Sequence, residues 1–203
     1  MAKETKPKSQ TPPPDAFNQD EKEQILNTFL TSHRYDHFYP FVYFLFLTGC
    51  RPSEAIGLRW EDISAGYKLI NFAGSITQIK SQAVRMSTSK TNRVRSLPIS
   101  AELRDLLEAC KRSAGEPFDL VFPSTEDLSI PINYQNFSKG AWARVVDPIV
   151  DRNTTPYSCR DTFITEQIAK GIPVTIVARW VDNSPDIINK HYFDISAVSF
   201  TPR

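Results

Sequence analysis

Arg51 is the first candidate for anion chemistry, because it is followed directly by Pro52. Proline is favoured at the first position of a helix, so Arg51 falls at the helix N-cap. Free backbone N–H groups and the positive end of the helix dipole favour an anion there, and a guanidinium adds a planar fork for two phosphate oxygens. Glu54, three residues later, lies on the same face and could orient the arginine. The alternative is an ordinary surface ion pair between Arg51 and Glu54.

A second arginine, Arg160, follows another helix start. Thr155 and Pro156 are typical of an N-cap and a first helical residue, so Tyr157 and Arg160 are expected on one face of the helix. The sequence therefore predicts a guanidinium and a phenol that project in the same direction.

The end of the chain carries a third candidate group, the phenol of Tyr192. It follows a polar turn at Asp182 and Asn183 and a helix predicted over residues 185–192. In isolation, a tyrosine in such a place is more often a half-buried anchor than a nucleophile.

Positive charge is concentrated between residues 63 and 100, where six cations occur without any Asp or Glu. The whole chain, by contrast, has 24 Lys+Arg against 23 Asp+Glu. Strands predicted over residues 68–72, 75–79 and 94–99 make this region a small antiparallel sheet with a basic hairpin. Such a hairpin can contact DNA phosphates, although a solvated basic turn is the alternative. The cations of this sheet that could make such contacts are Lys80, Arg85, Arg93 and Arg95.

The elements that must position these groups are mostly helices, so the predicted fold class is α+β: mostly α with a small antiparallel β-sheet. An aromatic stretch at residues 36–48 is apolar on all sides, which is typical of a buried helix, and Gly49 is well suited to end it. Two more helices are predicted from the caps Asn18 and Ser100. The other predicted helices cover residues 52–58, 134–146, 158–170 and 173–181.

Length and composition favour one domain. The chain has 203 residues, of which 40% are hydrophobic, enough for a sizeable core. Residues 1–17 contain four prolines and little apolar surface, so we interpret them as a flexible leader or linker and residues 18–203 as the domain.

Several function classes are disfavoured by the same composition. The three cysteines are widely spaced, which indicates neither a disulfide framework nor a zinc site and favours a reducing, cytoplasmic compartment. His33 and His37 have a metal-binding spacing but no third ligand follows, so no metal is expected. The longest apolar run is far shorter than the ~20 residues that span a bilayer, so no membrane association is expected.

Taken together, these segments resemble the catalytic domain of the tyrosine recombinase, or phage integrase, family. The family pattern has an Arg in T-G-x-R-x-x-E, a hairpin Lys, a His-x-x-Arg helix start, a Gly-His turn and a terminal Tyr. The residues at these positions are Arg51, Glu54, Lys90, Tyr157, Arg160, Asp182, Asn183 and Tyr192. Four residues depart from the pattern: Tyr157 replaces the first His, Asp161 stands where a second His is common, and Asp182-Asn183 replaces Gly-His.

The resemblance implies that Tyr192 attacks a DNA phosphodiester and forms a 3′-phosphotyrosyl link, which a second strand then reverses. It implies that Arg51 and Arg160 clamp the phosphate and that Lys90 protonates the departing 5′-oxygen. Tyr157 and Asn183 would donate hydrogen bonds without the charge of a His, with Glu54 and Asp161 in support. No cofactor is implied, neither ATP nor Mg²⁺.

The implied partner is double-stranded DNA, with a monomer in isolation and four protomers on two DNA sites. The tail Phe193–Arg203 has an apolar face suited to docking on a neighbour. Two alternatives stay open: a catalytically impaired DNA-binding module derived from the same family, and a helical protein-interaction domain with a basic hairpin.

Overall fold

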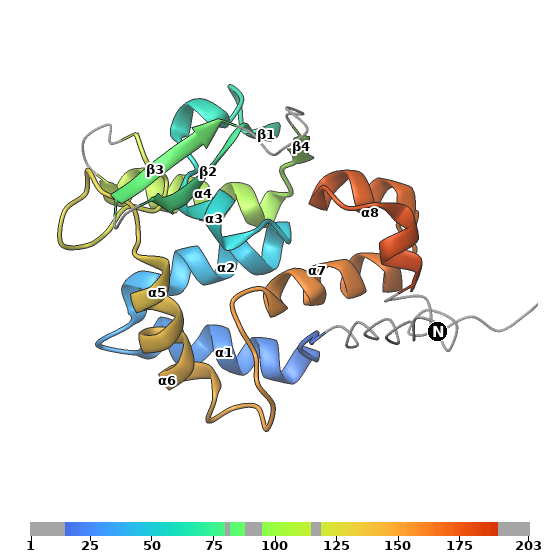
Figure 1. Cartoon of the computed structure of the whole chain (residues 1–203), viewed down its shortest axis with the longest axis horizontal. Coiled ribbons are helices and arrows are strands. Elements are labelled where there is room, and N and C mark those ends of the chain that lie inside the picture. Colours follow the sequence, from blue (N-terminus) through green and yellow to red (C-terminus); the bar gives the residue numbers. More distant parts are fainter. Residues whose placement is uncertain (1–14, 80–81, 88–94, 115–118, 191–203) are drawn as a thin grey trace, which may run out of the picture.

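The computed structural model describes residues 15–79, 82–87, 95–114 and 119–190 (Figure 1). The predicted fold class is confirmed, since helices predominate and the strands form two small antiparallel pairs. The longer helices are α1 (Gln19–Thr31), α2 (Tyr39–Thr48), α4 (Ala101–Ala114), α7 (Ser158–Ala169) and α8 (Val174–Val181). The short ones are η1 (Asp36–Phe38), α3 (Pro52–Ile56), η2 (Trp60–Asp62), α5 (Tyr134–Asn136), the π-helical η3 (Phe137–Trp142) and α6 (Ala143–Val146). A last helical segment covers residues 185–190, where the description ends.

The strands pair in an order that the sequence predicts only in part. β1 (Leu69–Phe72) pairs with β4 (Arg95–Pro98), so that Phe72 lies opposite Arg95. β2 (Gly74–Ile79) pairs with β3 (Gln82–Ser87) in a second two-stranded sheet. β3 was not predicted, because Val84 is its only β-branched residue and no Asn-Gly or Asp-Gly turn precedes it.

The core is built around α2, which is buried on most sides, as its aromatic composition predicts. In Figure 1 α2 lies at the centre, with α1 and α7 on one side and α3 and α4 on the other. Its Phe41 ring packs 5.1 Å from Phe137, and Phe44 packs 5.0 Å from Phe122, measured between ring centroids. The aromatic stretch is therefore core and does not form a surface platform.

Gly49 ends α2 and fixes how closely α2 meets α7. Its φ of 59° lies in the left-handed region, and a Cβ at this position would come within 2.4 Å of the Phe163 ring. This close approach brings the next residues, Cys50 and Arg51, beside α7. The local signal in the sequence thus places one predicted site residue against the helix that carries the other.

The packed part of the chain includes Phe17, which the sequence led us to place in the leader. Its ring packs on Phe46 and Trp142, and its N–H donates to Thr162 Oγ1 at 2.8 Å. Arg152 donates to the carbonyl of Ala16 at 3.1 Å and also lies over the Phe17 ring.

Among the helices in the described ranges, none combines the length and the apolar character that a bilayer span requires.

Candidate active site

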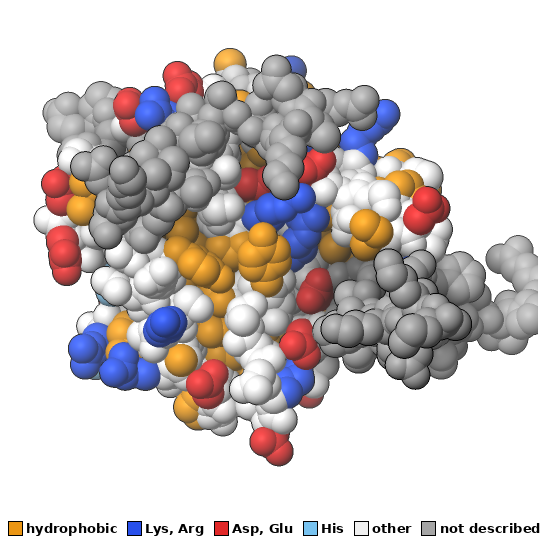
Figure 2. Space-filling view, viewed as in Figure 1, with side chains coloured by type: hydrophobic (Ala, Val, Ile, Leu, Met, Phe, Trp, Pro, Cys, Tyr) orange, Lys and Arg blue, Asp and Glu red, His pale blue; other side chains and the backbone are white. Residues whose placement is uncertain are grey.

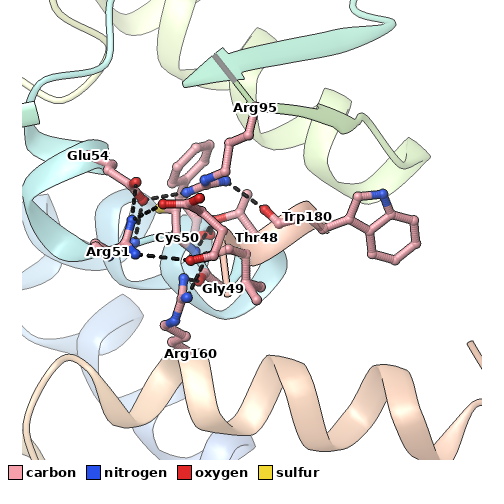
Figure 3. A network of polar contacts seen from close by, with 11 residues as sticks. Thr48, Gly49, Cys50, Arg51, Glu54, Arg95, Arg160 and Trp180 are labelled. Carbon is pink, nitrogen blue, oxygen red and sulfur yellow. Dashed lines mark hydrogen bonds and ion pairs between the residues drawn. The ribbon is translucent and has the colours of Figure 1, made fainter. Parts of the chain in front are cut away.

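Arg51 lies at the N-cap of α3, as predicted, and its side chain reaches the end of α8 (Figure 3). Its Nη1 donates to Glu54 Oε1 and to Asp182 Oδ2, both at 3.0 Å, and its Nη2 donates to the Asp182 carbonyl at 3.1 Å. Burial opposes the charged guanidinium, but the carboxylates of Glu54 and Asp182 outweigh it and raise the pKa of Arg51. Arg51 is therefore held as a cation and is more than a surface pair with Glu54.

Arg160, from α7, reaches the same place from the opposite side. It is buried, its Nη1 donates to the Gly49 carbonyl at 2.9 Å, and its Nη2 donates to the Val181 carbonyl. Burial and the nearby charges of Arg51 and Arg95 lower the pKa of Arg160 to about 10. Two neutral carbonyls hold it, so its positive charge stays available to an anion.

A third guanidinium, that of Arg95 on β4, joins the pair from inside the protein. Arg95 is buried, and its guanidinium donates to Glu54 and, at 2.7 Å, to the Trp180 carbonyl. The guanidinium carbon lies 3.8 Å from the centroid of the Phe72 ring. This placement differs from our expectation of a DNA contact on the hairpin. Arg95 alternates inward on β4, opposite Phe72, so tertiary pairing turns its charge towards Glu54.

Glu54 is the acceptor that holds two of these arginines. It is buried, and in addition to the two guanidiniums it accepts the Arg51 backbone N–H at 2.7 Å. Three guanidiniums and two carboxylates, those of Glu54 and Asp182, leave this group one positive charge in excess. One phosphodiester carries one negative charge, so the group can neutralise a single backbone phosphate.

The turn after α8 supplies acceptors that the sequence did not predict. Asp182 is the C-cap residue of α8, and the carbonyls of Trp180, Val181 and Asp182 each accept from a different arginine. Asn183 donates its N–H to the Ala178 carbonyl at 3.0 Å and accepts the Ser184 N–H on its own Oδ1 at 2.9 Å. Its amide oxygen thus serves the turn, which leaves its NH₂ group as a donor.

Tyr157 and Asp161 lie at the start of α7 but face different surroundings. Tyr157 is the N-cap residue and is 45% exposed. Asp161 accepts the Asp15 N–H on Oδ2 at 3.3 Å, so this carboxylate oxygen faces the N-terminal segment.

Of the predicted site residues, the structure brings together Arg51, Glu54 and Arg160, with Asn183 on the adjoining turn.

The remaining predicted residues are not placed. Lys80, Lys90, Arg93 and Tyr192 lie outside the described residues, and so does the side chain of Arg85, although its backbone belongs to β3. Figure 2 shows Lys or Arg side chains gathered at the centre of one face, near the junction of α3, α7 and α8, with an apolar patch beside them. Within the arginine group, Arg51 is the side chain open to solvent, with 31% of it exposed, whereas Arg95 and Arg160 are buried.

Two groupings bear on metal and thiol chemistry among the described residues. Within the described ranges, no three His, Cys, Asp or Glu side chains lie close enough to hold a metal ion. Cys50 is fully buried beside Arg51, and burial, with Glu54 nearby, raises its pKa to about 12. Such a thiol is a small apolar filler and does not ionise near neutral pH.

Comparisons with known proteins identify the family and the fold. The family model described as the phage integrase family matches residues 16–197. A structure of the Tn1549 transposon integrase in complex with transposon right-end DNA is similar with a TM-score of 0.79 and 18% identity, over 94% of this chain and 66% of that chain. XerA recombinase gives a TM-score of 0.66 and 16% identity, over 98% of this chain and 62% of that one.

A lambda integrase dimer bound to a COC′ core site gives a TM-score of 0.66 and 16% identity, over 96% of this chain and 52% of that chain. This chain thus spans about two thirds or less of the length of these three structures. No curated protein matches it. Because the family model covers most of the sequence and the fold is shared, the chain belongs to the phage integrase family.

Proposed function

We propose that this chain is the catalytic domain of a site-specific DNA recombinase, or integrase, that cleaves and rejoins strands through Tyr192. The phenol oxygen attacks the phosphorus, the bond to the 5′-oxygen breaks, and a 3′-phosphotyrosyl link and a free 5′-hydroxyl result. Attack by another 5′-hydroxyl reverses the step and joins a new strand. The bond energy is conserved in the intermediate, so the proposal needs no cofactor.

The observation that carries this proposal is the convergence of Arg51 and Arg160 on the end of α8 from distant segments. Negative charge builds up on the non-bridging oxygens during attack, and two guanidiniums held in advance stabilise it. Glu54 and the backbone carbonyls hold these side chains before DNA binds. Losing one such donor costs on the order of 3–4 kcal/mol of transition-state stabilisation.

Proton transfer is assigned to residues on either side of the phosphate. A free tyrosine has a pKa near 10, so forming the Tyr192 phenolate at pH 7 costs about 4 kcal/mol, which nearby guanidiniums reduce. Lys90 is proposed as the general acid for the 5′-oxygen. Tyr157 and Asn183 donate hydrogen bonds in place of two imidazoles, so we expect the geometry to be kept and proton transfer to be slowed.

Double-stranded DNA is the proposed partner. The Tn1549 transposon integrase and lambda integrase structures that share this fold contain DNA, which supports the same class of partner here. Lys80, Arg85 and Arg93 are proposed to contact the DNA backbone, and Asp161 to support the start of α7. We further propose that residues 1–14 act as a linker, since Phe17 belongs to the core. We also propose that monomers assemble as four protomers on two DNA sites, with the tail after Tyr192 on a neighbour.

A second candidate function is a DNA-binding module that does not cleave. It is favoured by the absence of both usual imidazoles at Tyr157 and Asn183 and by the carboxylate of Asp182 on Arg51. Such a module would compete for recombination sites. It would keep the arginine group and its salt-dependent affinity for DNA.

A nicked suicide substrate separates the two functions. Duplexes that cover the DNA flanking the coding sequence are nicked close to each candidate cleavage site. Cleavage then releases a short oligonucleotide that carries the free 5′-hydroxyl. Because this fragment diffuses away, religation is prevented and the covalent intermediate accumulates. We expect a protein–DNA adduct that survives denaturation and disappears in Tyr192→Phe. A mobility shift on these duplexes without an adduct would assign the chain to the binding module, and an adduct with Tyr192→Phe would refute the assigned nucleophile.

A further inference from the structure

The turn after α8 places a carboxylate on the solvent side of the arginine group. Asp182 has φ 52° and ψ 59°, a left-handed conformation that glycine adopts freely and other residues rarely do. The backbone turn therefore does not require this side chain. Its position is nevertheless well defined, because its carboxylate ends on Arg51.

Asp182 engages Arg51 as an external oxyanion would. Its Oδ2 accepts from Nη1 at 3.0 Å and its carbonyl oxygen accepts from Nη2 at 3.1 Å, so one residue occupies both terminal nitrogens. Guanidinium groups hold carboxylates and phosphates through paired contacts of this kind. A phosphate oxygen that approaches Nη1 therefore meets the Asp182 carboxylate there.

Both hydrogens of Arg51 Nη1 are engaged in the free protein. Nη1 has two hydrogens, and these are taken by Glu54 Oε1 and Asp182 Oδ2. A phosphate oxygen can therefore use Nη1 only after one of the two carboxylates has left it.

Exposure decides which carboxylate leaves. The Glu54 side chain is 11% exposed and also holds Arg95 and the Arg51 backbone N–H, whereas the Asp182 side chain is 37% exposed. Glu54 thus orients Arg51 from the buried side, and Asp182 covers it from the open side. The contact of Arg51 that is open to displacement by an oxyanion from solvent is the one with Asp182.

We propose that the Asp182 carboxylate is an internal competitor for the phosphate, which holds Arg51 Nη1 in the free protein and turns into solvent when an oxyanion binds. The identity of that oxyanion as a DNA phosphate rests on the proposed function. The competitor lowers the affinity of the site for any single backbone phosphate. Stable binding then requires additional contacts along the DNA, which disfavours cleavage at sites that lack them.

A positioning role for Asp182 makes the opposite prediction. If its carboxylate were needed to hold Arg51 in place, its removal would weaken anion binding. If it competes, its removal strengthens anion binding. One variant, Asp182→Asn, separates the two, because it keeps the size of the side chain and removes the charge.

The test is a sulfate titration of the isolated chain, followed through the Nε–Hε signals of its arginines in ¹⁵N NMR, with ionic strength held constant by chloride. We expect Asp182→Asn to bind sulfate about ten-fold more tightly than the wild type, equivalent to about 1.4 kcal/mol, the scale of one charge-assisted hydrogen bond. Asp186→Asn, which removes the same charge from a nearby exposed position, is expected to stay within about two-fold of the wild type.

Two further variants complete the experiment. Asp182→Gly removes the side chain and suits the left-handed backbone, so it is expected to tighten sulfate binding like Asp182→Asn even if the latter folds poorly. Arg51→Gln is expected to abolish the site. Equal or weaker binding by both Asp182 variants would overturn the proposal, as would the lack of any Arg51-dependent sulfate binding. Neither result involves DNA or Tyr192, so the suicide-substrate outcome is independent of this one.

Discussion

Replacing Glu54 by Gln tests whether one buried carboxylate balances the arginine group. Glu54 is 8% exposed and accepts from the Arg51 backbone, from the Arg51 guanidinium and from Arg95. Gln keeps the shape and one acceptor oxygen but removes the negative charge, which leaves buried guanidinium charge uncompensated. Breaking a buried ion pair in this way costs about 3–5 kcal/mol, and we expect the lower end, about 3 kcal/mol, because Arg51 is partly exposed.

The measurement is urea unfolding followed by circular dichroism, with thermal unfolding alongside. A loss of about 3 kcal/mol corresponds to a Tm lower by roughly 6–12 °C for a chain of this size. Glu61→Gln is the matched control, because Glu61 pairs with Arg59 at 3.6 Å on the exposed surface, and it is expected to cost less than about 0.5 kcal/mol.

A double variant tests the cause of that loss. Glu54→Gln with Arg95→Met removes the charge and one guanidinium that depends on it, so it is expected to lose at least about 1 kcal/mol less than the sum of the single changes. Strict additivity, or a Glu54→Gln loss no larger than that of Glu61→Gln, would refute the assignment of Glu54 as the central counter-charge.

Three further predictions concern the frame of the site. Gly49→Ala is expected to lose about 2–4 kcal/mol in urea unfolding, because its Cβ would lie 2.4 Å from the Phe163 ring at a positive φ. Phe17→Ala is expected to lose about 3 kcal/mol, because Phe17 is a core residue. The hydrogen bond from Arg152 lowers the pKa of Glu21, so its contribution to stability is present above the unfolded-state pKa and is lost as pH falls through the folded-state pKa. The urea midpoint should therefore fall on acidification below about pH 4.5, and Glu21→Gln should show less of this fall.

The Gly49 and Phe17 predictions each have a control variant at another position. Gly171→Ala also sits at a positive φ but meets nothing within 4 Å, so it should cost less than Gly49→Ala. Leu30, 54% exposed, should tolerate Ala with little loss. Equal losses within either pair would contradict the packing described for Gly49 or Phe17, and identical acid profiles for Glu21→Gln and the wild type would contradict the role of Arg152.

The parts of the fold that local signals determine were predicted well. Gly49 and Pro52 lie within four residues of one another, and together they correctly predict the end of α2 and the N-cap position of Arg51. The buried aromatic helix was also correct, because a segment that is apolar on all sides has few alternatives to the core.

Features that depend on distant pairing could not be predicted. The inward direction of Arg95 follows from the pairing of β4 with β1 and from a carbonyl of α8, neither of which is encoded near Arg95. Phe17 stands among prolines and polar residues, and only its contacts with α2 and η3 reveal it as core. The sequence shows that Asp182 replaces a glycine of the family pattern, but its bond to Arg51 required the geometry.

The central claim is that Arg51 and Arg160 act together on one phosphate, and cleavage rates on the suicide substrate test it most directly. Arg51→Lys and Arg160→Lys keep the charge but lose the planar fork, and each is expected to slow adduct formation on the order of a hundred-fold. Because both arginines serve the same phosphate, the double variant is expected to be slowed by less than the product of the two single effects. Wild-type rates in either folded single variant would contradict the claim.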